Sequence, residues 1–292
     1  QKDEERAFAI GRRHEKSIEY YKKYLEEEPM CDNGWYNLGV VYCIKEDYEK
    51  AIQAFDYAIA LNPENVSAYF NKANTYANNG KYELAIKAYN DFLMYEQENI
   101  YALFYIAECY EKLGNDTTAK KYFTNVLNID PLFSEAWYAL SLLELKNNNI
   151  EKAIETVEKA IRINKGNPDY WFTLGNLLKI NKKESSLILS CYDRAIELYP
   201  YNETMWIEYA EELSKYNGVN QAIQTLENAI DYLENDPEIL YTLAAYYYKN
   251  NQREKALEKF KIASMEDKKQ ASTFFNNCLP NSEDFKLFAG LI

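Results

Sequence analysis

The sequence predicts an all-α protein built from repeated pairs of helices. Helix breakers are sparse, with 9 Gly and 7 Pro among 292 residues, which argues against an all-β fold. All four tryptophans, Trp35, Trp137, Trp171 and Trp206, fall in one series, with Tyr69, Leu103 and Leu240 at its other positions, and the spacing is 34 residues, or 35 from Trp171 to Trp206. A fixed period of this length is typical of a repeat architecture.

Each repeat unit has the pattern of two amphipathic helices of about a dozen residues. A small residue follows the tryptophan position by four, which lets another helix approach the backbone. These small residues are Gly39, Ala73, Ala107, Ser141, Gly175, Ala210 and Ala244. A large apolar residue follows the tryptophan position by about twenty. This series is Phe55, Tyr89, Phe123, Val157, Tyr192, Leu226 and Phe260. The turn between the two helices contains Gly80 or Gly114, which can adopt the left-handed conformation.

The stretch from Trp35 to Tyr42, WYNLGVVY, and the stretch from Asp47 to Pro63, DYEKAIQAFDYAIALNP, resemble the tetratricopeptide repeat almost letter for letter. The resemblance covers nearly the whole chain. It implies a right-handed α-α superhelix, a solenoid whose concave groove binds extended peptides or partner helices.

The pattern divides the chain into a short front, seven full repeats and a tail. Residues 1–31 read as a truncated first repeat, with Ser17–Pro29 as its second helix, His14 in its turn, and further repeats expected before Gln1. The full repeats are predicted at 32–65, 66–99, 100–133, 134–167, 168–202, 203–236 and 237–268. Residues 269–292 are predicted to form a helical cap.

Two residues depart from the repeat pattern, because Glu144 and Lys72 occupy positions that are apolar or aromatic in the sister repeats. A buried, unpaired carboxylate is costly. We therefore expect Glu144 to reach water at a helix edge.

An aromatic stripe follows the tryptophan position by one residue and is expected to face the concave groove. It consists of Tyr36, Phe70, Phe104, Tyr138, Phe172, Ile207 and Tyr241. Two interpretations remain open: the rings pack between repeats, or they form an accessible ladder that also contacts a ligand. Further groove residues expected to bind the partner are Asn74, Tyr101, Glu108, Glu135, Asp169, Asn176 and Glu238.

The groove favours a protein or peptide partner with Lys or Arg among apolar residues, docking on Glu108, Glu135, Asp169 and Glu238. A solvated acidic face without a partner is the rival interpretation. A clamp for a C-terminal carboxylate is not expected, since Tyr36 and Val40 stand where the resemblance would place Lys and Asn. The formal charge of −13 argues against nucleic acid.

No catalytic site, cofactor site or metal site is predicted. His14 is the only histidine, the five cysteines form no CxxC pair, and phosphate-loop and nucleophile-elbow motifs are missing from the sequence. No apolar run is long enough to span a membrane. A reducing, cytoplasmic location is expected, although the sequence does not begin with Met.

Two alternatives to a free-standing scaffold remain open. The chain could be the partner-recruiting lobe of a larger enzyme, for example a glycosyltransferase, but an asparagine ladder that begins at Asn37 and Asn71 is broken at Tyr105, Ala139 and Thr173. Self-association through an exposed terminal helix face is also possible.

Overall fold

A computed structural model of the chain describes residues 2–266, and this part is all-α, with fifteen helices and no strand among the described residues. The chain forms two compact units, Gln1–Ala136 and Trp137–Ile292. The predicted fold class is thereby confirmed, while the predicted cap at 269–292 lies outside the described residues.

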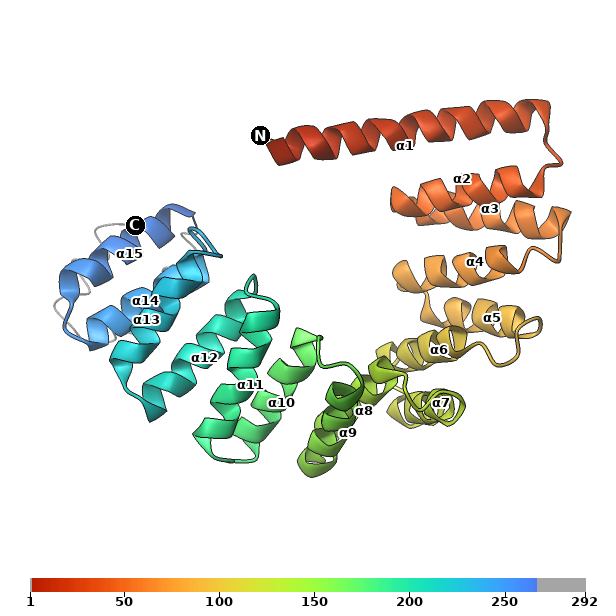
Figure 1. The fold of residues 1–292 in the computed structure, drawn as a ribbon. Coiled ribbons are helices and arrows are strands. Elements are labelled where there is room, and N and C mark those ends of the chain that lie inside the picture. The colour runs from red at the N-terminus through yellow and green to blue at the C-terminus, as the bar shows by residue number, and fades with distance from the viewer. Residues whose placement is uncertain (1, 267–292) are drawn as a thin grey trace. The chain divides into compact units, whose positions relative to one another are not determined.

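The first unit is a series of antiparallel helices, each packed on the next along the chain (Figure 1). The helices are α1 (Lys2–Glu27), α2 (Asp32–Ile44), α3 (Tyr48–Leu61), α4 (Val66–Asn78), α5 (Tyr82–Leu93), α6 (Ile100–Lys112) and α7 (Asp116–Ile129). Packing is most extensive within the pairs α2–α3, α4–α5 and α6–α7.

The second unit repeats this arrangement, and α8 (Ser134–Lys146) contains the boundary between the units. The following helices are α9 (Ile150–Ile163), α10 (Pro168–Ile180), α11 (Ser185–Leu198), α12 (Glu203–Tyr216), α13 (Val219–Ile230), α14 (Pro237–Lys249) and α15 (Arg253–Glu266). The helices pack in the pairs α10–α11, α12–α13 and α14–α15.

Local sequence signals set the helix ends. The side chains of Asn65 and Asn99 accept a hydrogen bond from a backbone N–H three residues on, which satisfies one free donor of the first turn of α4 and of α6. In the turns after α4 and α6, Gly80 and Gly114 have φ of 70° and 75°. Both glycines therefore adopt the left-handed conformation expected from the sequence.

The core of each helix pair rests on the small residue of the first helix and the large residue of the second. A Cβ added to Gly39 would lie 2.7 Å from the Phe55 ring, and one added to Gly175 would lie 2.6 Å from the Tyr192 ring. Phe55 and Tyr192 are both completely buried. The glycines thus allow a ring to contact the helix backbone directly.

The tryptophans hold the loop that precedes each first helix. The indole N–H groups of Trp35, Trp171 and Trp206 donate to backbone carbonyls six residues earlier, at 2.9, 3.0 and 2.8 Å. Each indole therefore fixes a loop as well as filling space between helices, which accounts for tryptophan at these positions.

The truncated first repeat is not organised as the sequence suggests. Residues 2–27 form the single helix α1, so His14 lies inside a helix and not in a turn. Gly11 is the only strong breaker in this stretch, and its Ala, Arg, Glu and Lys residues favour continued helix. The expected turn at His14 is therefore wrong.

The expectation for Glu144 is also wrong. Its side chain is only 2% exposed. Asn149 Nδ2 donates to one carboxylate oxygen at 2.8 Å, and Lys152 Nζ lies 3.2 Å from the other. Burial is tolerated because both oxygens have partners. Lys72 is similarly compensated, since its Nζ lies 2.5 Å from Asp56 Oδ1.

Replacing Gly175 with valine is expected to destabilise the chain by about 1–3 kcal/mol, because the buried Tyr192 ring cannot move away from the added side chain. Denaturant unfolding followed by circular dichroism measures the change. Lys121→Val on the exposed face of α7 is the control, with an expected change within about 0.5 kcal/mol. An equal effect of both substitutions would contradict the proposed packing.

Replacing Ser141 with alanine is expected to stabilise the chain by roughly 1 kcal/mol. Its buried hydroxyl has no hydrogen-bond partner among the described residues, so its removal eliminates a desolvation cost. Thermal and denaturant midpoints should both rise. A fall in either midpoint would show that the hydroxyl makes a favourable interaction.

Candidate functional site

The aromatic stripe contacts the core ring of its own helix pair in both units. Ring centroids are 5.9 Å apart for Tyr36 and Phe55, and 5.6 Å apart for Phe172 and Tyr192. Phe104 and Tyr241 are 8% and 5% exposed, so they are packing residues with little surface for a ligand. Tyr36, Phe70, Tyr138, Phe172 and Ile207 are half-buried and keep part of their surface accessible.

Three predicted site residues of the first unit meet in one cavity of about 370 Å³, which we call the aromatic hollow. Tyr36, Phe70 and Tyr101 line it together with Phe92 and Tyr105. Its remaining lining residues are Val66, Ser67, Asn71, Glu96 and Asn99. Tyr101 is 54% exposed. This hollow therefore presents aromatic surface from α2, α4, α5 and α6 to a ligand.

Hydrogen bonds and ring contacts hold the walls of the aromatic hollow. Asn71 Nδ2 donates to the Tyr36 hydroxyl at 2.8 Å, joining α4 to α2. The Phe70 ring lies 5.0 Å from Phe92 and 6.1 Å from Tyr105. The hollow is thus largely preformed, which lowers the cost of ordering side chains on binding.

Two other predicted residues, Asn74 and Glu108, line a second cavity of about 420 Å³, which we call the polar hollow. Tyr105 lines both hollows and stacks on Tyr89, with 5.9 Å between ring centroids. The Tyr89 hydroxyl donates to Asn74 Oδ1. The remaining lining residues are Ala77, Asn78, Tyr82, Cys109 and Lys112.

Glu108 is the distinctive group of the polar hollow. Burial, and then the neighbouring charge of Glu111, raise the pKa of its half-buried carboxyl, while Lys112 partly opposes them. Among the described residues, no hydrogen bond or ion pair holds the carboxylate. A cationic side chain that entered the hollow would supply the missing partner.

Glu135 is exposed and lies in the same unit. The Ser134 hydroxyl donates to it at 3.0 Å. Burial raises the pKa of Tyr105, and the charges of Glu108 and Glu135 raise it further. Both carboxylates thus act on the hydroxyl of the residue that lines both hollows.

The remaining predicted residues belong to the second unit. The Tyr138 and Thr173 hydroxyls are 3.1 Å apart, and the Tyr192 hydroxyl donates to Asn176 Oδ1 at 2.6 Å. Asp169 and Glu238 are exposed. These residues are spread over α8, α10 and α14.

Sequence reasoning missed Tyr105 and Asn71 as members of a site. Both appeared only as an asparagine ladder and its interruption, whereas the structure places them on the walls of the aromatic hollow. The available signal was their position in the repeat. Asn71 directly follows Phe70, and Tyr105 directly follows Phe104, so both lie next to the aromatic stripe.

Within residues 13–266, no group of His, Cys, Asp and Glu side chains is arranged to hold a metal ion. Over the same residues, no helix has the length and apolar character needed to cross a membrane.

Four models of the tetratricopeptide repeat match the chain, at residues 33–65, 54–87, 101–132 and 117–177. No curated protein sequence matches it. The matches are therefore to models of the repeat itself.

Solved structures of similar fold include yeast Tom70, with a TM-score of 0.63 and 18% identity, covering 95% of this chain and 61% of that chain. The C-terminal part of a repeat-containing protein from Cytophaga hutchinsonii has a TM-score of 0.63 and 19% identity, covering 87% of this chain and 98% of that chain. Pseudomonas aeruginosa pilF has a TM-score of 0.58 and 18% identity, covering 71% and 94% respectively. At these identities the likeness shows the fold alone.

The raised pKa of Glu108 predicts that the stability of the folded chain depends on pH, with a defined direction. A carboxyl with a higher pKa in the folded chain binds protons there before the unfolded chain does, so its burial disfavours folding above the folded pKa. This cost disappears as pH falls through that pKa toward the ordinary value of about 4.3. Wild type should therefore gain stability relative to Glu108→Gln as pH falls from 7 to 4.

Thermal unfolding of both proteins across this pH range measures the difference. Glu83→Gln, an exposed position on α5, is the matched control and should follow wild type throughout. A constant difference between wild type and Glu108→Gln would show that burial does not perturb this carboxyl.

Proposed function

Because the chain belongs to the tetratricopeptide repeat family, we propose that it is a non-enzymatic scaffold that binds an extended protein segment in the aromatic and polar hollows of its first unit. The observation that carries the proposal is that Tyr105 lines both cavities, which therefore adjoin each other. One offers preformed aromatic walls and the other offers Glu108.

The two cavities favour neighbouring side chains of different chemistry. An aliphatic or aromatic side chain would bury its surface against Phe70, Phe92 and Tyr101. A Lys or Arg side chain would donate to the carboxylate of Glu108, which lines the polar hollow. Exposed Glu135 would attract such a segment over longer range.

The second unit supplies the further exposed acids Asp169 and Glu238, which we propose as secondary contacts for a basic partner. The four cysteines that the structure describes are free thiols. They support a reducing compartment such as the cytoplasm as the place of action.

Selection from a random nine-residue peptide library on the immobilised chain tests the proposal. Peptides with Lys or Arg near an apolar residue should be enriched. Against one such peptide, Glu108→Gln should lose about tenfold in affinity, because a half-buried, charge-assisted contact disappears. Glu135→Gln should mainly weaken the salt dependence of association.

Tyr101→Ala should also lower the affinity for the peptide. The substitution removes exposed aromatic surface and leaves the buried rings of the core unchanged. Tyr216→Ala on α12, where the tyrosine is 60% exposed, is the matched control and should leave the affinity unchanged. Retention of full affinity and salt dependence by Tyr101→Ala and by the Glu108→Gln, Glu135→Gln double variant would overturn the proposal.

A further inference from the structure

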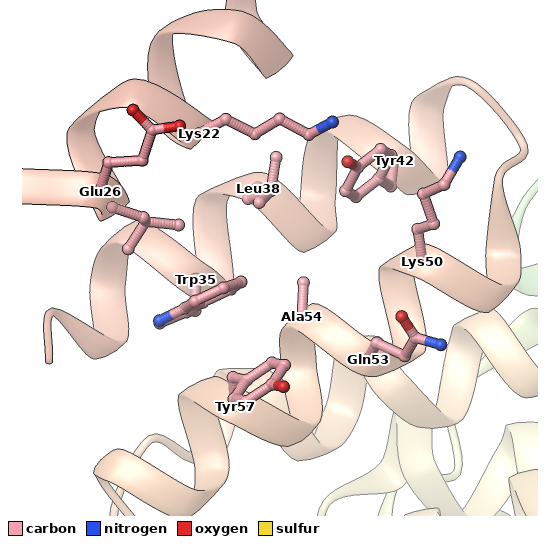
Figure 2. A pocket seen from close by; sticks show the side chains of 10 residues that line it. Lys22, Glu26, Trp35, Leu38, Tyr42, Lys50, Gln53, Ala54 and Tyr57 are labelled. Carbon is pink, nitrogen blue, oxygen red and sulfur yellow. The ribbon is translucent and has the colours of Figure 1, made fainter. Parts of the chain in front are cut away.

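A third cavity lies on α1, α2 and α3 of the first unit and shares no residue with the aromatic or polar hollow. Its volume is about 320 Å³, and we call it the lysine hollow. Figure 2 shows Trp35 and Tyr57 at one end, and Lys22 and Lys50 extending toward Tyr42 at the other. Leu25, Leu38 and Ala54 form its apolar floor.

The two ends of the lysine hollow differ in character. Trp35 and Tyr57 are stacked, with 4.5 Å between their rings, and Tyr57 is 56% exposed. At the other end, Lys50 Nζ lies 5.6 Å from the centre of the Tyr42 ring and 2.5 Å from Asp47 Oδ2. Lys22 has no ion pair among the described residues. The hollow therefore combines apolar surface with an unpaired cation, in a chain whose net charge is −13.

The surroundings of Lys22 include acids as well. Glu26 lines the hollow one turn further along α1, on the side of Trp35. An adjoining cavity of about 300 Å³ shares Lys22, Tyr42 and Lys50, and it also contains Glu15 and Glu19. Glu15 is already paired with Lys45 at 3.3 Å. None of these carboxylates forms a salt bridge with Lys22 in the described part of the chain.

In the next repeat, an ion pair occupies the position that corresponds to the lysine hollow. Thirty-four residues after Lys22, Leu38 and Tyr42 come Asp56, Lys72 and Tyr76. There Lys72 crosses from α4 to Asp56 on α3, with 2.5 Å between Nζ and Oδ1, and lies 5.9 Å from the centre of the Tyr76 ring. The chain itself thus places a cation and a carboxylate together beside the tyrosine.

In the lysine hollow the pair is incomplete. The outer helix carries the cation Lys22 where the next repeat carries a carboxylate, and Leu38 cannot reach across as Lys72 does. A carboxylate from another molecule would complete the arrangement. The apolar floor beneath requires an aliphatic or aromatic side chain beside that carboxylate.

We propose that the lysine hollow is a second docking site, which binds a partner segment carrying an Asp or Glu next to a large apolar residue. The carboxylate pairs with Lys22 and the apolar side chain covers Leu25, Leu38 and Ala54. This site goes beyond the proposed function, because it lies on other helices and selects the opposite charge.

The test uses a variant that closes the hollow with the chain's own chemistry. Lys22→Asp combined with Leu38→Lys transfers the Asp56–Lys72 pair of the next repeat into the lysine hollow. Leu38 is only 3% exposed, whereas the Lys72 side chain is 23% exposed, so the double variant should keep the helicity of wild type and melt at a lower temperature. Circular dichroism checks both quantities.

Peptides selected on wild type from the nine-residue library are then titrated against each protein by fluorescence polarisation. We expect a class of acidic and apolar peptides that loses at least tenfold in affinity to the closed variant and keeps its affinity for Glu108→Gln. The single variant Lys22→Gln should lose affinity in the same direction, which keeps the test valid if Leu38→Lys proves unstable. Lys87→Gln, exposed on α5, is the matched control.

Failure to enrich acidic peptides, or equal binding by wild type and Lys22→Gln, would overturn the inference while leaving the basic peptides of the proposed function unaffected. Sedimentation velocity tests whether a second copy of the chain occupies the lysine hollow. A wild-type dimer that dissociates in the closed variant would replace the foreign acidic segment with a second copy of the chain.

Discussion

The rest of the structure depends on the contact between a large side chain on the second helix of each pair and a small residue on the first. At Gly39 and Gly175 the contact is closest, since a ring lies where a Cβ would otherwise be. This proximity fixes the separation of the two helices. With the separation fixed, the side chain one residue after the tryptophan position has to lie against the same ring, which explains why Tyr36 and Phe172 are only half accessible.

In two repeats the large side chain is a tyrosine, and its hydroxyl carries the core contact through to the proposed binding face. Tyr89 donates to Asn74 and Tyr192 donates to Asn176. Each amide oxygen thereby accepts one hydrogen bond, which leaves its second lone pair and the amide hydrogens for a ligand. Burial raises the pKa of both tyrosines well above the usual range, which keeps each hydroxyl a donor at any physiological pH.

The sequence predicts features that recur in every repeat, because a periodic pattern averages over seven examples. The helix pairs and the small residues follow from it, while the left-handed Gly80 and Gly114 follow from the turn sequences of their own two repeats. Features that occur once are not predictable in this way. Glu144 is buried because Asn149 and Lys152 happen to reach it, and α1 is continuous because no strong signal interrupts it. The hollows depend on volume that neighbouring side chains leave empty, which a linear pattern does not record.

The three hollows differ in the charged residues that line them, and this difference lets one fold carry sites of opposite charge. Lys22 and Asp56 are equivalent in the repeat, and both are exposed. A change at such a position alters which charge is unpaired at the surface without altering the spacing of the helices. Binding chemistry is therefore set repeat by repeat, and Glu108 and Lys22 can face different partners within one unit.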